Sequence, residues 1–150
     1  MRIHLGGDHA GFAMKQVIGD YMRELGHDVT DVGPFDDQPV DYPDFALKVA
    51  RAVRDGEAER GVLVCGTGIG MAIAANKVRG VRAAMITAPE LAEMARRHND
   101  LNVLTIGGRY TDSATAKRIV DMFLTTEFEA GRHERRIDKI KHMEDPAHRE

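Results

Sequence analysis

The chain has 150 residues, of which 43% are hydrophobic and 30% charged, and its formal net charge at pH 7 is −3. This size and balance predict one globular domain over residues 1–150 with a sizeable core. The slightly acidic balance gives no support to general nucleic-acid binding. Met1–Leu5 does not resemble a signal peptide and no apolar stretch is long enough to span a bilayer, so we expect a cytoplasmic protein without nucleic-acid or membrane partners.

Cys65 is the only cysteine, which excludes an internal disulfide and a cysteine-rich zinc site. The seven histidines show no metal-ligand spacing, since the residue four positions after His133 is Ile137, and we therefore expect no zinc site. A lone cysteine is either a small buried hydrophobic side chain or a reactive thiol. The residues around Cys65 in the sequence are needed to distinguish a buried side chain from a reactive thiol.

The first half of the chain alternates short apolar runs with helical spacing. In chain order, it predicts a strand at Arg2–Gly6, a helix at about Gly11–Leu25, a strand at His27–Val32, a loop at Gly33–Pro43 and a helix at Asp44–Arg54.

The second half continues the pattern with a β-branched strand, a glycine-rich turn and further helices. It predicts strands at Val62–Cys65, Val81–Ile86 and Val103–Ile106, and helices at Met71–Lys77, Pro89–His98, Asp112 or Ser113 to Leu124, and Arg132–Met143, with a frayed tail from Pro146.

Strand–helix alternation predicts an α/β fold with a parallel sheet and helices on both faces. Ligands bind beyond the carboxyl ends of the strands in such sheets. Those ends carry Gly6–His9, Cys65–Gly68 and Gly107–Arg109, while His98–Asp100 precedes the last strand. We therefore expect polar and glycine residues to gather at one edge of the sheet.

The turn Gly66–Gly70 fits none of the common anion-binding patterns. The last glycine of a dinucleotide fingerprint, counted from Gly66, falls on Met71. The arginine of a cysteine phosphatase loop, counted from Cys65, also falls on Met71, and no Gly-Lys-Ser/Thr follows. What remains is a thiol before a loop of amides and a helix start, a field that favours thiolate and suits proton abstraction beside a carbonyl. A purely structural role for Cys65 and its glycines stays open on spacing alone.

Motifs in order along the chain resemble type B ribose-5-phosphate isomerases, whose relatives act on galactose 6-phosphate and allose 6-phosphate. They are Gly6–Gly11, Asp41–Pro43, Cys65–Gly70, Ala74–Lys77, His98-Asn99, Gly107–Arg109, and Arg132-His133 with Arg136. The resemblance implies a three-layer α/β/α, Rossmann-like domain with a five-stranded parallel sheet of order 2-1-3-5-4. It also implies a homodimer, or a tetramer, with sites shared between subunits and neither metal nor cofactor.

The resemblance also implies catalytic roles in converting ribose 5-phosphate to ribulose 5-phosphate through an enediolate. Cys65 takes the proton beside the carbonyl and returns it to the neighbouring carbon, His98 opens the sugar ring, and Thr67 moves protons between two oxygens. Some members place a glutamate base at the position held here by Met71. This chain therefore belongs with the cysteine enzymes.

Binding roles follow from the same resemblance. Asp8 and Asn99 are expected to hold sugar hydroxyls, although each suits a turn or cap equally well. The remaining expected contacts are Gly66, Thr67, Gly68, Ile69 and Gly70 on the enediolate, Tyr42 at the border, and His9, Arg109, Arg132 and Arg136 on phosphate. Arg132 and Arg136 are four residues apart and share a helix face, from which family members reach across the dimer interface.

Two other functions fit the same residues. A six-carbon sugar phosphate is an alternative substrate, with the Gly33–Pro43 loop setting the depth of the pocket. A non-catalytic sugar-phosphate sensor is the other alternative, and it predicts the loss of Cys65 or His98, both of which are present.

Overall fold

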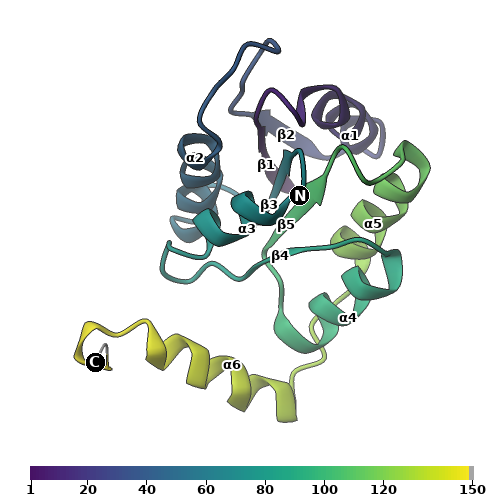
Figure 1. Cartoon of the computed structure of the whole chain (residues 1–150). Coiled ribbons are helices and arrows are strands. Elements are labelled where there is room, and N and C mark those ends of the chain that lie inside the picture. Colours follow the sequence, from purple (N-terminus) through teal and green to yellow (C-terminus); the bar gives the residue numbers. More distant parts are fainter. Residues whose placement is uncertain (149–150) are drawn as a thin grey trace.

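The computed structural model describes residues 1–148, in which strands and helices alternate as the sequence predicts (Figure 1). The strands are β1 (Arg2–Gly7), β2 (Asp28–Asp31), β3 (Arg60–Cys65), β4 (Ala83–Met85) and β5 (Val103–Gly107). The helices are α1 (Phe12–Glu24), α2 (Tyr42–Arg54), α3 (Ile69–Ala75), α4 (Pro89–Asn99), α5 (Ser113–Thr125) and α6 (Arg132–Met143). A short 3₁₀ helix at Pro146–His148 forms where the sequence predicts the start of a frayed tail, and the rest of that predicted tail lies outside the described residues.

All five strands pair in parallel in the order β2-β1-β3-β5-β4, which confirms the predicted α/β class and strand order. The chain runs outward to β2 on one side of β1 and to β5 and β4 on the other. The strand order therefore reverses between β1 and β3, where sheets of this kind leave a crevice for a ligand. The three strands that end in glycine motifs, β1, β3 and β5, are direct neighbours.

Successive residues of β3 face opposite sides of the sheet, as the period of a strand requires. Val62 and Val64 belong to the core under α1, α4 and α5. Leu63 and Cys65 belong to the core under α2 and α3, where Met71 is also fully buried. Figure 1 shows these two helical layers on either side of the sheet. The register of β3 thus directs the thiol toward α3.

Two helices begin earlier than the sequence predicts. Helix α3 starts at Ile69 because Gly68, at φ +79°, turns the chain in the left-handed region that glycine adopts without strain. Helix α2 starts at Tyr42 with Pro43 in its first turn, where a missing N–H costs nothing. The predicted Gly33–Pro43 loop therefore ends at Asp41.

Lys15 holds the start of the loop between β2 and α2. Its ammonium group is buried, 2.7 Å from Asp31 Oδ1 and 2.8 Å from the carbonyl oxygen of Pro34. Asp31 also accepts a hydrogen bond from the Gly33 amide at 2.8 Å. A buried charge is tolerated when it is paired and hydrogen-bonded in this way. The loop therefore leaves the sheet from a fixed base.

Helix α6 projects from the body and contacts it mainly at α4 (Figure 1). Its inner residues His133 and Ile137 are buried, but Ile140 and Met143 farther along are 41% and 69% exposed. A groove of about 790 Å³ separates this part of α6 from the body, with Arg82, Asn99 and Leu101 in its wall. Within residues 1–148, no helix has the length and hydrophobicity needed to cross a membrane.

Candidate active site

The Cys65 side chain ends β3 and is 5% exposed. The Cys65 sulfur accepts a hydrogen bond from the Gly68 amide at 3.1 Å, and the backbone carbonyl oxygen of Cys65 accepts one from the Gly108 amide at 2.8 Å. The first bond brings the partial positive charge of an amide hydrogen to the sulfur. The second ties the end of β3 to the turn after β5, so the backbone around the thiol is fixed from both sides.

The loop after Cys65 is held by contacts that only small residues allow. The buried hydroxyl of Thr105 in β5 donates to the Gly68 carbonyl oxygen at 2.7 Å. A Cβ atom on Gly107 would lie 2.6 Å from the carbonyl oxygen of Thr67. The exposed Thr67 hydroxyl accepts from the Ile69 amide at 3.2 Å, which leaves its proton free for another acceptor.

The turn after β1 lies against the same edge. The buried Asp8 carboxylate accepts a hydrogen bond from the Gly11 amide at 2.9 Å, so Oδ2 is the oxygen left for a ligand. A Cβ atom on Gly11 would collide with the Val64 carbonyl group, which shows how closely this turn packs on β3. His9 is exposed, and its Nδ1 accepts from the Val40 amide at 3.3 Å, which ties the far end of the β2–α2 loop to this edge.

Arg109 and Tyr42 complete the edge around the thiol. The Arg109 guanidinium lies over Gly66, and its Nη1 is 3.2 Å from where a Cβ atom on Gly66 would stand. The backbone amide of Arg109 donates to the Gly66 carbonyl oxygen at 3.1 Å. The Tyr42 ring packs on Gly70, with its hydroxyl 3.0 Å from the corresponding position. One chain therefore brings together Asp8, His9, Tyr42, Gly66, Thr67, Gly68, Ile69, Gly70, Cys65 and Arg109.

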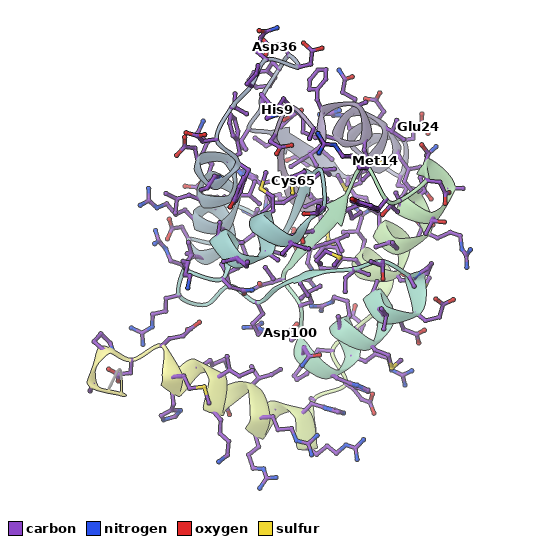
Figure 2. The ribbon with its side chains drawn as sticks, in the orientation of Figure 1. His9, Met14, Glu24, Asp36, Cys65 and Asp100 are labelled. Atoms are coloured by element: carbon purple, nitrogen blue, oxygen red, sulfur yellow. The ribbon has the colours of Figure 1, made fainter. Side chains whose placement is uncertain are left out.

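The other four expected site residues lie at the opposite edge of the sheet. Helix α4 runs away from the carboxyl edge, so His98 and Asn99 stand beside the amino end of β5, and the Asn99 carbonyl oxygen accepts from Arg82 Nε at 3.0 Å. The Glu129 amide donates to the Arg97 carbonyl oxygen at 3.0 Å, which places the start of α6, with Arg132, here as well. Figure 2 shows the separation, with Cys65 and His9 in the upper half of the view and Asp100 in the lower half. Within one chain, His98 therefore lies apart from Cys65, because α4 runs back toward the amino ends of the strands.

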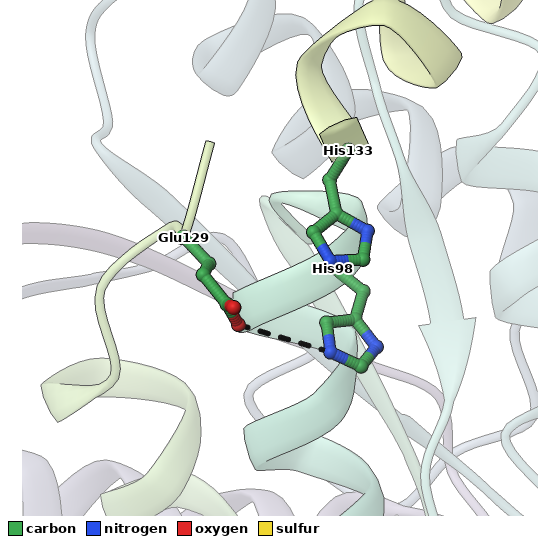
Figure 3. A group of neighbouring side chains, drawn as sticks. All are labelled: His98, Glu129 and His133. Atoms are coloured by element: carbon green, nitrogen blue, oxygen red, sulfur yellow. Dashed lines mark ion pairs between the residues drawn. The ribbon is translucent and has the colours of Figure 1, made fainter. Parts of the chain in front are cut away.

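Figure 3 shows the surroundings of His98. Its ring stacks on His133 of α6, with centroids 4.3 Å apart and an interplanar angle of 12°. Its Nε2 lies 3.9 Å from Glu129 Oε2, an oxygen that also lies 3.3 Å from Arg97 Nε. Sequence spacing gives no hint of this cluster, since its members lie on two helices and a connecting segment.

Comparison with known proteins decides the family. A model of the ribose/galactose isomerase family matches residues 3–140. The chain is 43% identical over 143 residues to ribose-5-phosphate isomerase B of Escherichia coli, covering 95% of this chain and 96% of that protein. The chain belongs to the ribose/galactose isomerase family.

Solved structures agree with this membership. Ribose-5-phosphate isomerase B of Clostridium thermocellum superposes with a TM-score of 0.95 at 48% identity, covering 96% of this chain and 97% of that one. The enzyme of Mycoplasma genitalium with bound ribulose-5-phosphate superposes with a TM-score of 0.91 at 42% identity, covering 95% of each chain. The resemblance to type B ribose-5-phosphate isomerases is therefore confirmed, and with it the prediction of a Rossmann-like isomerase.

Two residues that hold backbone in place have no expected role in the sequence predictions, although Asn76 lies in the quoted motif Ala74–Lys77. Thr105 fixes Gly68, and its only signal is a hydroxyl within the apolar strand Val103–Gly107. Asn76 makes two hydrogen bonds of 2.8 Å with Ala83 at the start of β4. Its Nδ2 donates to the Ala83 carbonyl oxygen, and its Oδ1 accepts from the Ala83 N–H. Thr105 acts on backbone 37 residues away and Asn76 on backbone seven residues away, and neither contact follows from the helix or strand pattern.

Gly68→Ala is expected to destabilise this isomerase-family chain and to impair the loop. The left-handed φ costs about 1–3 kcal/mol for a residue with a side chain. In addition, the new Cβ would lie 2.9 Å from Met85 Cγ and 3.0 Å from the Gly107 nitrogen. Gly56→Ala is the matched control, because Gly56 has φ +75° with nothing within 4 Å of the added carbon. Urea unfolding should show a larger loss for Gly68→Ala, and equal losses would contradict the packing argument.

Proposed function

We propose that this chain is one sugar-phosphate isomerase domain that interconverts D-ribose 5-phosphate and D-ribulose 5-phosphate through an enediolate, with Cys65 as the base. The observation that carries the proposal is the Gly68 amide at 3.1 Å from Cys65 Sγ, at the carboxyl edge of the sheet. A structural neighbour that holds ribulose-5-phosphate adds support for the choice of sugar. The conversion is redox-neutral within the substrate, so its electron balance requires no cofactor.

In the first chemical step, the Cys65 thiolate removes the proton from C2 of the open-chain aldose. The C2–H electron pair forms the C1–C2 double bond, and the carbonyl oxygen takes up the negative charge. In the second half of the reaction, a proton moves from O2 to O1 and the electrons left on O2 form the C2 carbonyl. The C1–C2 π pair takes the proton back from the thiol onto C1, which regenerates the thiolate. The buried position of Cys65 supports this role, because hydrogen bonds to its sulfur and to its carbonyl oxygen already orient the side chain.

The enediolate needs donors aimed at its oxygens. Amide groups in the first turn of a helix lack helical partners, and α3 begins directly after the loop at Ile69. One preorganised donor of this kind is worth about 2.7–4 kcal/mol in comparable oxyanion sites. The proton on the Thr67 hydroxyl is free, which supports its role in moving a proton between O1 and O2.

Ring opening and binding use the remaining residues. His98 acts as acid toward the ring oxygen, and Asp8 and Asn99 hold sugar hydroxyls. Arg109 and His9 contact the phosphate from the Cys65 edge, and Arg132 and Arg136 contact it from α6. The exposure of all four phosphate ligands supports this assignment, since an incoming anion must reach them.

The separation of these residues within one chain supports a homodimer with shared sites. Cys65 lies at the carboxyl edge, whereas His98, Asn99, Arg132 and Arg136 lie at the amino edge. If both sets act on one substrate, two chains must supply them. Exposed apolar side chains beside the catalytic loop favour such a contact, among them Ile69 at 51%, Ile73 at 58% and Tyr110 at 80%. A tetramer of two such dimers keeps the same sites.

The substrate assignment is tested by comparing ribose 5-phosphate with allose 6-phosphate and galactose 6-phosphate in the presence of a chelator. We expect kcat/KM to favour ribose 5-phosphate by about 10–200-fold, the discrimination typical of one additional carbon unit in a fitted pocket. Turnover should persist with chelator. Equal activity on the six-carbon sugars would overturn the five-carbon assignment, and loss of turnover with chelator would overturn the metal-free mechanism.

A non-catalytic sensor is the second candidate. It would bind both sugar phosphates without interconverting them, so the same assay excludes or establishes it. The presence of both Cys65 and His98 speaks against it. For the isomerase we retain the cytoplasmic location expected from the sequence.

A further inference from the structure

Three side chains with metal-ligand chemistry meet between α4 and α6 (Figure 3). His98 lies in the last turn of α4, His133 lies in the first turn of α6, and Glu129 lies in the segment that joins α5 to α6. Their ligand atoms all lie within 4.8 Å of one another. In the proposed isomerisation His98 has a catalytic role, whereas Glu129 and His133 have none.

The buried nitrogen of His133 lacks a partner. Its side chain is 5% exposed, and among the described residues Nε2 has no hydrogen-bond partner. Leaving a buried polar atom unpaired costs free energy, so such an atom calls for an explanation. Burial, and secondly the neighbouring His98, lower the pKa of His133, which keeps its ring in the neutral form that metals bind.

We propose that His98, Glu129 and His133 bind a divalent transition-metal ion of the Zn²⁺ class, and that this ion inhibits the isomerase. Two imidazoles and one carboxylate form a ligand set that holds zinc and leaves one coordination position open. Mg²⁺ and Ca²⁺ prefer oxygen ligands, so they should compete poorly. The inhibitory effect rests on the proposed ring-opening role of His98, whereas the binding of the ion does not.

Binding requires a small movement of exposed groups. Zinc–nitrogen distances of about 2.0–2.1 Å place tetrahedral ligand atoms roughly 3.4 Å apart. The stacked rings lie nearly parallel, at 12°, so their in-plane lone pairs do not meet at one point. His133 is buried, whereas the His98 side chain is 37% exposed and that of Glu129 is 48% exposed. His98 and Glu129 therefore turn toward His133, and the stack opens.

Positive charges near the cluster limit the affinity but do not exclude an ion. Arg97 pairs with Glu129, and Arg132 and Arg136 are close enough to act on His133 electrostatically. When the ion takes the Glu129 carboxylate, Arg97 keeps its second partner, Glu93, at 3.2 Å. We therefore expect a reversible, inhibitory site whose occupancy follows the concentration of free metal.

Binding is measured on the chelator-stripped full chain by Zn²⁺ calorimetry and by the visible absorption of bound Co²⁺. We expect one ion per chain, and an affinity more than about tenfold weaker in Glu129→Gln and in His133→Ala, since even outer-shell partners of metal ligands are worth about 10–100-fold. Glu90→Gln is the matched control, because Glu90 is an exposed carboxylate on α4 outside the cluster. Glu129 is exposed, so its variant tests the site even if His133→Ala does not fold.

Unchanged binding in Glu129→Gln would overturn the site. Binding that is lost in Cys65→Ala but kept in Glu129→Gln would overturn it too, because the thiol would then hold the ion. In the kinetic assay, Zn²⁺ should inhibit turnover of ribose 5-phosphate by the wild type and Glu90→Gln, and at least about tenfold more Zn²⁺ should be needed for Glu129→Gln. Each variant is compared with its own metal-free rate. If the chain had no isomerase activity, the proposed function would fail while the binding result still decided the metal site.

Discussion

Replacing Cys65 with alanine is expected to lower kcat for ribose 5-phosphate by at least about 10²–10⁴-fold, the usual contribution of a general base. Sugar-phosphate binding should remain close to that of the wild type, because the thiol acts on a carbon-bound proton and the phosphate contacts lie elsewhere. Met71, the position at which some relatives place a glutamate base, is fully buried and offers no substitute. The measurements are steady-state turnover and calorimetric binding of ribose 5-phosphate.

Cys65→Ser separates chemistry from packing. A serine hydroxyl occupies nearly the same volume beside the Gly68 amide, but it is a far weaker acid, so this variant should also be inactive. Release of deuterium from C2-labelled ribose 5-phosphate into water reports proton abstraction alone and should disappear in both variants. Turnover or deuterium release at the wild-type rate in either variant would show that another group is the base.

Arg136→Ala is expected to raise KM by about 10–100-fold, which corresponds to the roughly 1.5–3 kcal/mol of a hydrogen bond to a charged group. The value of kcat should change less, because the phosphate is remote from the reacting carbons. Arg136 is exposed on α6, so the free energy of unfolding should not change. Inorganic phosphate, which competes for the same contacts, should inhibit the variant less strongly than the wild type.

Two neighbouring substitutions control this result. Arg135→Ala removes an equal charge from the adjacent exposed position, on a different face of α6 from Arg132 and Arg136, and should leave KM nearly unchanged. Arg136→Lys keeps the charge but loses the planar fork that matches phosphate, so its KM should be intermediate. Equal KM values for Arg136→Ala and the wild type would remove Arg136 from the phosphate site.

Mixing the Arg136→Ala and Cys65→Ala chains tests whether they share a site. In a hybrid dimer, one site carries both defects and the other carries neither. Random pairing should therefore restore about a quarter of the wild-type sites, seen best at low substrate concentration. No recovery after verified exchange of subunits would indicate that each chain builds its site alone.

The class of fold could be predicted from local pattern because alternating strands and helices leave few arrangements of a parallel sheet. The differences between the predicted and observed elements lie at the ends of the helices and strands. Gly68 and Pro43 mark where the chain turns into α3 and α2, but which residue takes the first helical position depends on contacts such as that of Thr105 with Gly68. Those contacts come from strands distant in sequence.

The sequence by itself determined the family, the order of the strands through that resemblance, and the single thiol at the end of a strand before a glycine loop. Only the tertiary structure decided what surrounds His98. The direction of α4 carries it to the amino edge, where Glu129 and the buried His133 join it, although 31 residues or more separate them from His98 in the chain. Spacing along the sequence detects ligands that share one helix or loop, whereas this cluster forms because α6 folds back onto α4.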